Sequence, residues 1–137
     1  MHQPDQSWER LTKLADQTDM PWICLGDFDE ILSQDEKTGA RRPLSPIQVI
    51  RNPLQMCDLY DLGYTGEKFT WWNRREHPHT VRERLDRACA NSAWKSKFPI
   101  ACVTHLPLIY SDHCPMLLET EQGGLSNPQK ETAAVSI

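Results

Sequence analysis

The chain has 137 residues, a length that predicts a single domain. Hydrophobic residues make up 39% and charged residues 25% of it, an ordinary globular balance. A nucleic-acid-binding surface is normally basic, so the net charge of −4 at pH 7 argues against strong nucleic-acid affinity.

The first third of the chain predicts a helix, a buried strand and a second helix. Apolar residues at helical spacing predict the first helix over about 8–15. The apolar run 22–25 predicts a buried strand that ends at Asp27. The second helix is predicted to begin at Ser45-Pro46. We expect it to be kinked or broken just before Pro53, because an interior proline costs about 3 kcal/mol or more.

The rest of the chain predicts a β-hairpin, a short helix and two further strands. The hairpin is expected to pair 69–72 with 80–90, and Ser92 is expected to cap the short helix. The further strands are predicted over 101–106 and 116–118. We assign residues 1–121 to one domain. Residues 122–137 are polar and aperiodic, which predicts a disordered tail outside it.

Two acids follow the first predicted strand. Asp27 and Asp29 lie on either side of Phe28, and residues two apart in an extended chain point the same way. Both carboxylates would then lie at one strand end, with Phe28 turned into the core. Such a pair suits a divalent metal ion or a proton-transfer site. A polar turn after a buried strand would have the same residues.

A second group of polar residues lies near the other end of the chain. Asp112-His113 precedes the last apolar run, and Asp86 lies inside the returning strand of the hairpin. Hydrogen bonding to a carboxylate orients an imidazole and raises its basicity. Alone, an Asp-His pair is more often part of a turn than of a site.

Taken together in this order, the motifs resemble the endonuclease/exonuclease/phosphatase superfamily. Within this superfamily, the residues of the motifs are most similar to those of the endonuclease domain of plant non-LTR (LINE-type) retrotransposons, over roughly Trp8 to Glu119. The motifs are Leu25-Gly26-Asp27-Phe28, Glu30-Ile31-Leu32, Asp61-Leu62-Gly63, Phe69-Thr70-Trp71, Glu83-Arg84-Leu85-Asp86-Arg87-Ala88, Thr104-His105-Leu106-Pro107 and Ser111-Asp112-His113-Cys114-Pro115.

The resemblance implies an α/β fold and a chemistry. The fold would be the C-terminal part of a four-layer sandwich, with mixed β-sheets flanked by helices and the N-terminal half missing. The activity would be Mg²⁺- or Mn²⁺-dependent cleavage of DNA phosphodiesters. The partners would be DNA, the missing N-terminal half and a reverse transcriptase encoded by the same element.

The resemblance also implies a role for each motif residue. Asp27 would orient or deprotonate the attacking water, and Asp86 would orient His113. His113 would hydrogen-bond the scissile phosphate, and Asp112 would bind the metal ion. Asp29 would be a further catalytic residue. The DNA contacts implied in and around the hairpin are Thr70, Trp71, Arg74 and Arg84.

Two departures from the family pattern favour an alternative. Asp29 stands where the family usually has Asn, and a carboxylate can only accept hydrogen bonds where an amide can also donate. No glutamate on a predicted strand stands where the family's main metal ligand should be. The alternative is therefore an inactive remnant that is at most a nucleic-acid- or protein-binding module. A phosphatase acting on lipid or small phosphates fits the residues of the motifs less well.

The five cysteines and the hydropathy indicate the compartment. No C-x-x-C pair occurs, which argues against a zinc site. An odd cysteine count in apolar contexts is typical of reduced, buried thiols in an intracellular protein, here nuclear or cytoplasmic. No apolar run approaches membrane-spanning length and the first residues do not resemble a signal peptide, so no membrane partner is expected.

Overall fold

The computed structural model describes residues 4–17, 20–107, 112–121 and 133–136. They form a mixed α/β fold with three α-helices and several small sheets. The elements are α1 (Pro4–Gln17), β1 (Trp22–Asp27), the 3-10 helix η1 (Gln34–Glu36), α2 (Leu44–Met56), β2 (Tyr60–Asp61), β3 (Thr65–Gly66), β4 (Trp71–Trp72), β5 (Arg82–Glu83), β6 (Asp86–Ala90), α3 (Ser92–Lys97), β7 (Cys102–His105), β8 (Met116–Glu119) and β9 (Ala133–Ser136).

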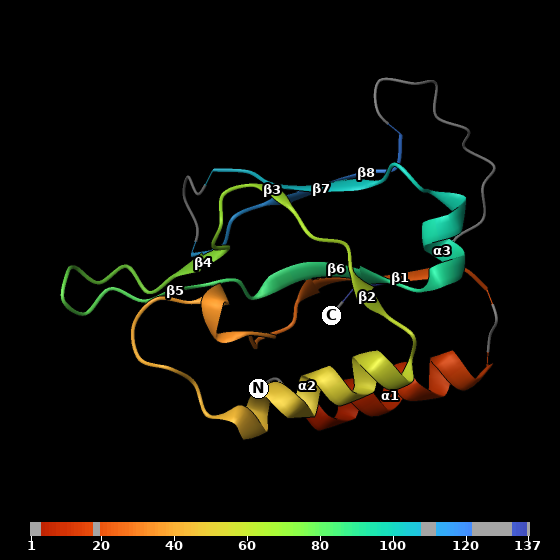
Figure 1. The fold of residues 1–137 in the computed structure, drawn as a ribbon, viewed down its shortest axis with the longest axis horizontal. Helices are drawn as coiled ribbons and strands as arrows, with labels where there is room; N and C mark the ends of the chain where they lie inside the picture. The colour runs from red at the N-terminus through yellow and green to blue at the C-terminus, as the bar shows by residue number, and fades with distance from the viewer. Residues whose placement is uncertain (1–3, 18–19, 108–111, 122–132, 137) are drawn as a thin grey trace.

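The elements are stacked in layers (Figure 1). A four-stranded sheet of order β2-β6-β1-β9 lies between the helices α1 and α2 on one side and a three-stranded sheet, β3-β7-β8, on the other. The β4-β5 hairpin extends from one end of these layers. The predicted α/β class is thus confirmed in its coarse form. The complete four-layer sandwich is not seen in the described parts of the chain.

Side-chain alternation along β1 and β6 divides the core into two halves. One half joins the four-stranded sheet to α1 and α2 through Cys24, Cys89 and Leu54. The other half lies between the two sheets and contains Ile23 and Ala88. Asp27 and Asp86 have the same parity as this second pair. Their side chains therefore leave the sheet on the side of β7 and β8.

A buried group of four charges lies beside the start of β6. Arg84 contacts Asp61 at 2.8 Å, and Arg87, whose side chain is fully buried, contacts Glu36 at 2.9 Å. Burial alone would raise the pKa of Glu36 and of Asp61. The arginine hydrogen bonds and charges outweigh it and hold both pKa values below their ordinary range. The group ties η1 and β2 to the start of β6.

Three predicted boundaries differ from the structure. Helix α2 begins at Leu44 and continues through Pro53 to Met56. Of the two expected outcomes, a break is therefore wrong, and a kink stays a prediction. Pro53 has no amide to donate to the carbonyl four residues earlier, but only the last turn of α2 follows that point, and Leu54 still packs in the core. The cap of α3 is Asn91 rather than Ser92, because the Asn91 side chain accepts the Trp94 amide at 3.0 Å.

The returning strand of the hairpin and the tail also need correction. The predicted strand 80–90 is divided into β5 and β6, because Thr70 takes up the Leu85 amide that a continuous strand would pair with its neighbour. In the predicted disordered tail, residues 133–136 form β9. This strand pairs in parallel with β1 and occupies an edge that would otherwise have open backbone groups. Residues 122–132 and 137 lie outside the described part.

Within the described residues, no helix combines the length and apolar character that crossing a bilayer requires. The predicted burial of the cysteines is confirmed for four of the five. All five cysteines are free, four are buried, and Cys102 is half-buried.

Candidate active site

Asp27 and Asp86 lie opposite each other at one end of the four-stranded sheet, as the last residue of β1 and the first of β6. The amide of Asn91 bonds to the carbonyl of Trp22, and counting the register from that pair makes Asp27 and Asp86 a non-hydrogen-bonded pair. In such pairs the Cα atoms are about 4.5 Å apart and the side chains leave the same face. Sheet geometry therefore brings the two carboxylates together.

His113 reaches this pair from the segment that precedes β8. Its Nδ1 lies 2.7 Å from an oxygen of Asp86, and its Nε2 lies 3.7 Å from an oxygen of Asp27. A backbone bridge to Trp71 fixes the segment against β4. We expected four residues of the motifs, Asp27, Asp86, Asp112 and His113, to converge at one sheet edge, and three of them do. The Asp86 carboxylate lies where it can orient the imidazole, whereas Asp112 is not part of the group.

The surroundings shift the pKa of two site residues upward. Burial is the main cause that raises the pKa of Asp27, and the Asp86 charge adds to it against the lowering effect of the Asp29 amide. Burial alone would lower the pKa of His113. The hydrogen bond to Asp86 and the charges of Asp86 and Asp27 outweigh it and raise that pKa overall. The metal-free site therefore stabilises the protonated imidazole relative to an ordinary histidine.

Asp29 does not join this group. The expectation that Asp27 and Asp29 point the same way is wrong, because β1 ends at Asp27 and the backbone of Asp29 is left-handed, with φ of 60°. Asp tolerates this region better than most residues. The Asp29 amide donates to Asp27 Oδ1 at 2.7 Å, so Asp29 orients Asp27 through its backbone while its side chain is exposed. Phe28 is buried, as predicted.

Asp112, the expected metal ligand, is also outside the group. Its carboxylate accepts from Arg74 Nε at 2.7 Å, and both side chains are largely exposed. The backbone carbonyl of Asp112 accepts the Trp72 amide at 3.2 Å. Since the preceding residues 108–111 lie outside the described part, Ser111 of the Ser-Asp-His motif is not placed.

The four residues expected to contact DNA differ in how exposed their side chains are. The expectation is wrong for Thr70 and Arg84, whose side chains are buried. Arg84 is neutralised by Glu36 and Asp61, which no local sequence pattern indicated. Arg74 is exposed, contacts Asp112 and lies 5.9 Å from the Trp72 ring centre. Trp71 is half-buried and packs beside Leu85.

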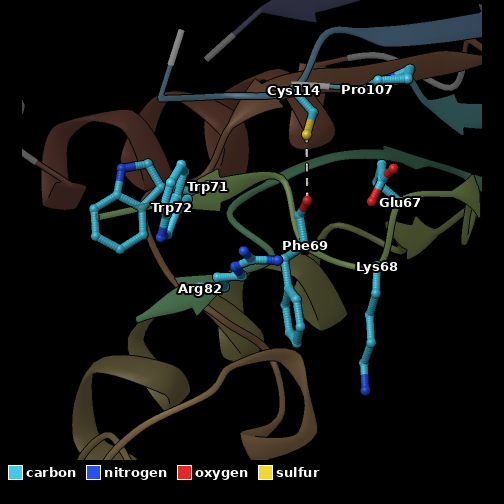
Figure 2. Close-up of a pocket in the computed structure, with 8 residues that line it drawn as sticks. All are labelled: Glu67, Lys68, Phe69, Trp71, Trp72, Arg82, Pro107 and Cys114. Atoms are coloured by element: carbon cyan, nitrogen blue, oxygen red, sulfur yellow. Dashed lines mark hydrogen bonds between the residues drawn. The ribbon is translucent and has the colours of Figure 1, made fainter. Parts of the chain in front are cut away.

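A cavity of about 470 Å³ opens next to the site. Figure 2 shows the indoles of Trp71 and Trp72 at one end of it and Glu67 and Pro107 at the other. Arg82 stacks over Trp72 at 5.3 Å. Trp71 also borders the His113 segment, so the cavity and the site share a wall.

The donor atoms of Asp27, Asp86 and His113 could hold a divalent metal ion. One ligand atom from each lies within 4.8 Å of the others, and among the described residues this is the only such cluster. Two carboxylates match the oxygen preference of Mg²⁺ and Mn²⁺, and the imidazole is also accepted by softer ions.

Two features of the site were missed in the sequence. The first is the buried counter-charge for Arg87, although strand alternation places Arg87 on the same face as Leu85 and Cys89, which indicates burial and a need for acidic partners. The second is the position of Thr70 behind Asp86, for which the sequence has no signal.

No protein-family model matches the chain, and no curated protein is significantly similar to it.

Proposed function

We propose that the chain carries a hydrolytic site for phosphodiesters, formed by Asp27, Asp86 and His113. The observation that supports it is the Asp86–His113 contact of 2.7 Å beside a second carboxylate. A carboxylate, an imidazole that it orients and an adjacent acid are the groups that general acid-base chemistry at a phosphate requires.

Each side chain has a distinct role in the proposal. Asp27, which lies 3.7 Å from the imidazole of His113, orients the attacking water or accepts a proton from it. The water oxygen forms a new bond to phosphorus while the bond to the leaving oxygen breaks. Protonated His113 donates a hydrogen bond to a phosphate oxygen, and Asp86 holds the ring in place. A Mg²⁺ or Mn²⁺ ion bound by the two carboxylates would supply charge stabilisation at the phosphate.

The substrate we propose is DNA, and the parent fold is the endonuclease/exonuclease/phosphatase sandwich of LINE-type retrotransposons. Support comes from the ordered motifs and from the way in which three of them converge at one sheet end. Arg74, Arg82 and the two tryptophans form the surface beside the site that suits phosphate contact and base stacking.

The second candidate is an inactive remnant that binds nucleic acid or protein. A specific observation favours it: the expected metal ligand Asp112 is engaged by Arg74, which leaves three donors where the family has a larger set. In that case the Asp86–His113 contact only stabilises the fold, and the neighbouring cavity is the binding surface. A second chain that supplies a glutamate to the site would be the partner expected to restore activity.

The test is a plasmid-nicking assay on the purified chain in Mg²⁺, in Mn²⁺ and in EDTA. The variants are Asp27→Asn and His113→Ala. Asp16→Asn is the matched control, because Asp16 is an exposed aspartate on α1 far from the site in sequence. The proposal predicts nicking that EDTA abolishes and that each site variant slows by about 100-fold or more, the usual contribution of a general acid or base.

Either of two results would reject the hydrolytic proposal. One is the absence of nicking by a folded wild-type chain in both metals, which would favour the second candidate, an inactive remnant. The other is nicking that His113→Ala leaves unchanged, which assigns the activity to another site or to a contaminant.

A further inference from the structure

Thr70 is the residue that connects the two halves of the candidate site. It lies just before β4 and is fully buried. Its hydroxyl oxygen accepts two backbone amides, from Leu85 at 2.9 Å and from Asp86 at 3.0 Å. Its own amide donates to Glu83 O at 3.0 Å. Three hydrogen bonds thus join this one residue to the point where β5 ends and β6 begins.

The Asp86 amide needs this acceptor because no strand in the described part of the chain supplies one. In the β1-β6 ladder Asp86 belongs to a non-hydrogen-bonded pair, so its amide points away from β1. On that other side β2 pairs with β6 only at Cys89 and Ala90. The Thr70 hydroxyl therefore takes the place of a strand carbonyl at the residue that carries the site carboxylate.

Thr70 also holds the segment that carries His113. Its carbonyl accepts the Cys114 amide at 2.7 Å, and the thiol of Cys114 donates to the neighbouring Phe69 carbonyl at 3.4 Å (Figure 2). Trp71, the next residue, forms the backbone bridge to His113. One short segment, 69–71, is consequently bonded to both partners of the imidazole–carboxylate contact.

We propose that Thr70 is a positioning residue that sets the contact between His113 and Asp86 through its side-chain hydroxyl. Its importance for hydrolysis rests on the proposed function, but its effect on the imidazole does not. Removing the hydroxyl leaves two buried amides without an acceptor, which favours a shift of the first residues of β6. The carboxylate moves with them, whereas His113 stays held by the Thr70 carbonyl. The 2.7 Å contact then lengthens.

The test compares Thr70→Val, which keeps the shape and loses the acceptor, with Thr70→Ser, which keeps the hydroxyl. Long-range ¹H–¹⁵N spectra of the imidazoles, recorded on metal-free protein at one alkaline pH, show which ring nitrogen of neutral His113 carries the proton. The contact with Asp86 selects the Nδ1–H tautomer. We expect wild type and Thr70→Ser to hold this tautomer and Thr70→Val to lose it.

Two controls separate positioning from general damage. Thr104→Val removes a threonine hydroxyl on β7 that bonds only to the hydroxyl of Thr65 in the described structure, and it should leave His113 unchanged. The exposed His79 in each spectrum shows the tautomer ratio of a histidine outside the site. If Thr70→Val does not fold, Thr70→Cys takes its place, because a thiol is a weaker acceptor.

A folded Thr70→Val, or Thr70→Cys in its place, with an unchanged Nδ1–H tautomer overturns the proposal. So does a Thr70→Ser variant that loses the tautomer as fully as Thr70→Val. The NMR samples contain neither metal nor DNA. Failure of the chain to nick plasmid would therefore reject the proposed function without affecting the conclusion that Thr70 sets the His113 tautomer.

Discussion

At the scale of single residues, the site depends on which charges are neutralised. His113 has two carboxylates within 4 Å and is only half-buried, so its proton is stabilised. Arg84 and Arg87, which look equally available in the sequence, are paired inside the fold. Arg74 and Asp112 neutralise each other at the surface, where such a pair contributes about 1 kcal/mol or less.

We predict that His113 of the metal-free protein titrates above 6.5, its ordinary value. Asp86→Asn should lower that pKa, because the carboxylate supplies the hydrogen bond and charge that offset burial. NMR titration of the imidazole measures both. The linked stability is present below 6.5 and is lost as the pH rises through the raised value. An unchanged pKa in Asp86→Asn would contradict the assigned contact, while Asp16→Asn should have no effect.

At the scale of elements, the buried group of four charges beside the start of β6 joins parts of the chain that the hydrophobic core does not join. Glu36 comes from η1 and Asp61 from β2, and both reach arginines beside the site strand. A buried pair adds little stability relative to apolar residues of the same size, but removing one partner leaves a buried charge without compensation. The group therefore acts mainly as a constraint on where β6 begins.

We predict that Arg87→Met destabilises the fold by about 3–5 kcal/mol, the usual cost of breaking a buried pair from one side. Glu36 and Asp61 would lose a partner that is itself fully buried. Urea unfolding followed by circular dichroism measures the loss. Arg51→Met on the exposed face of α2 is the matched control and should change stability by less than about 0.5 kcal/mol. A similar small loss in Arg87→Met would show that the group is not a constraint.

At the scale of the whole molecule, the sequence predicts short-range features well and long-range ones poorly. The strand end at Asp27 and the hairpin follow from local alternation. The Asp86–His113 pair spans 27 positions and was expected only from the resemblance of the motifs to a known family. The burial of Arg84 depends on Glu36, which is 48 positions away. The division of β5 from β6 likewise depends on a hydroxyl 15 positions away. No window of local sequence contains these partners, so propensity cannot indicate them.

Strand β9 leads to a prediction about the whole chain. It covers the β1 edge from Trp22 to Leu25, and an open edge is a template for pairing with another chain. A chain that ends at Glu121 should therefore associate at concentrations where the full chain is monomeric. Size-exclusion chromatography with light scattering compares the two. Equal masses for both, at equal concentration, would mean that β9 has no protective role.

The central claim is that Asp27, Asp86 and His113 form one site that binds a divalent ion. Substoichiometric Mn²⁺ added to ¹⁵N-labelled protein tests it most directly, because this paramagnetic ion broadens most strongly the signals of the amides nearest to it. We predict that the amides of Asp27, Asp86 and His113 broaden first and that Asp27→Asn abolishes this effect. First broadening at exposed acids elsewhere, such as Asp58, or none at any residue, would contradict the claim.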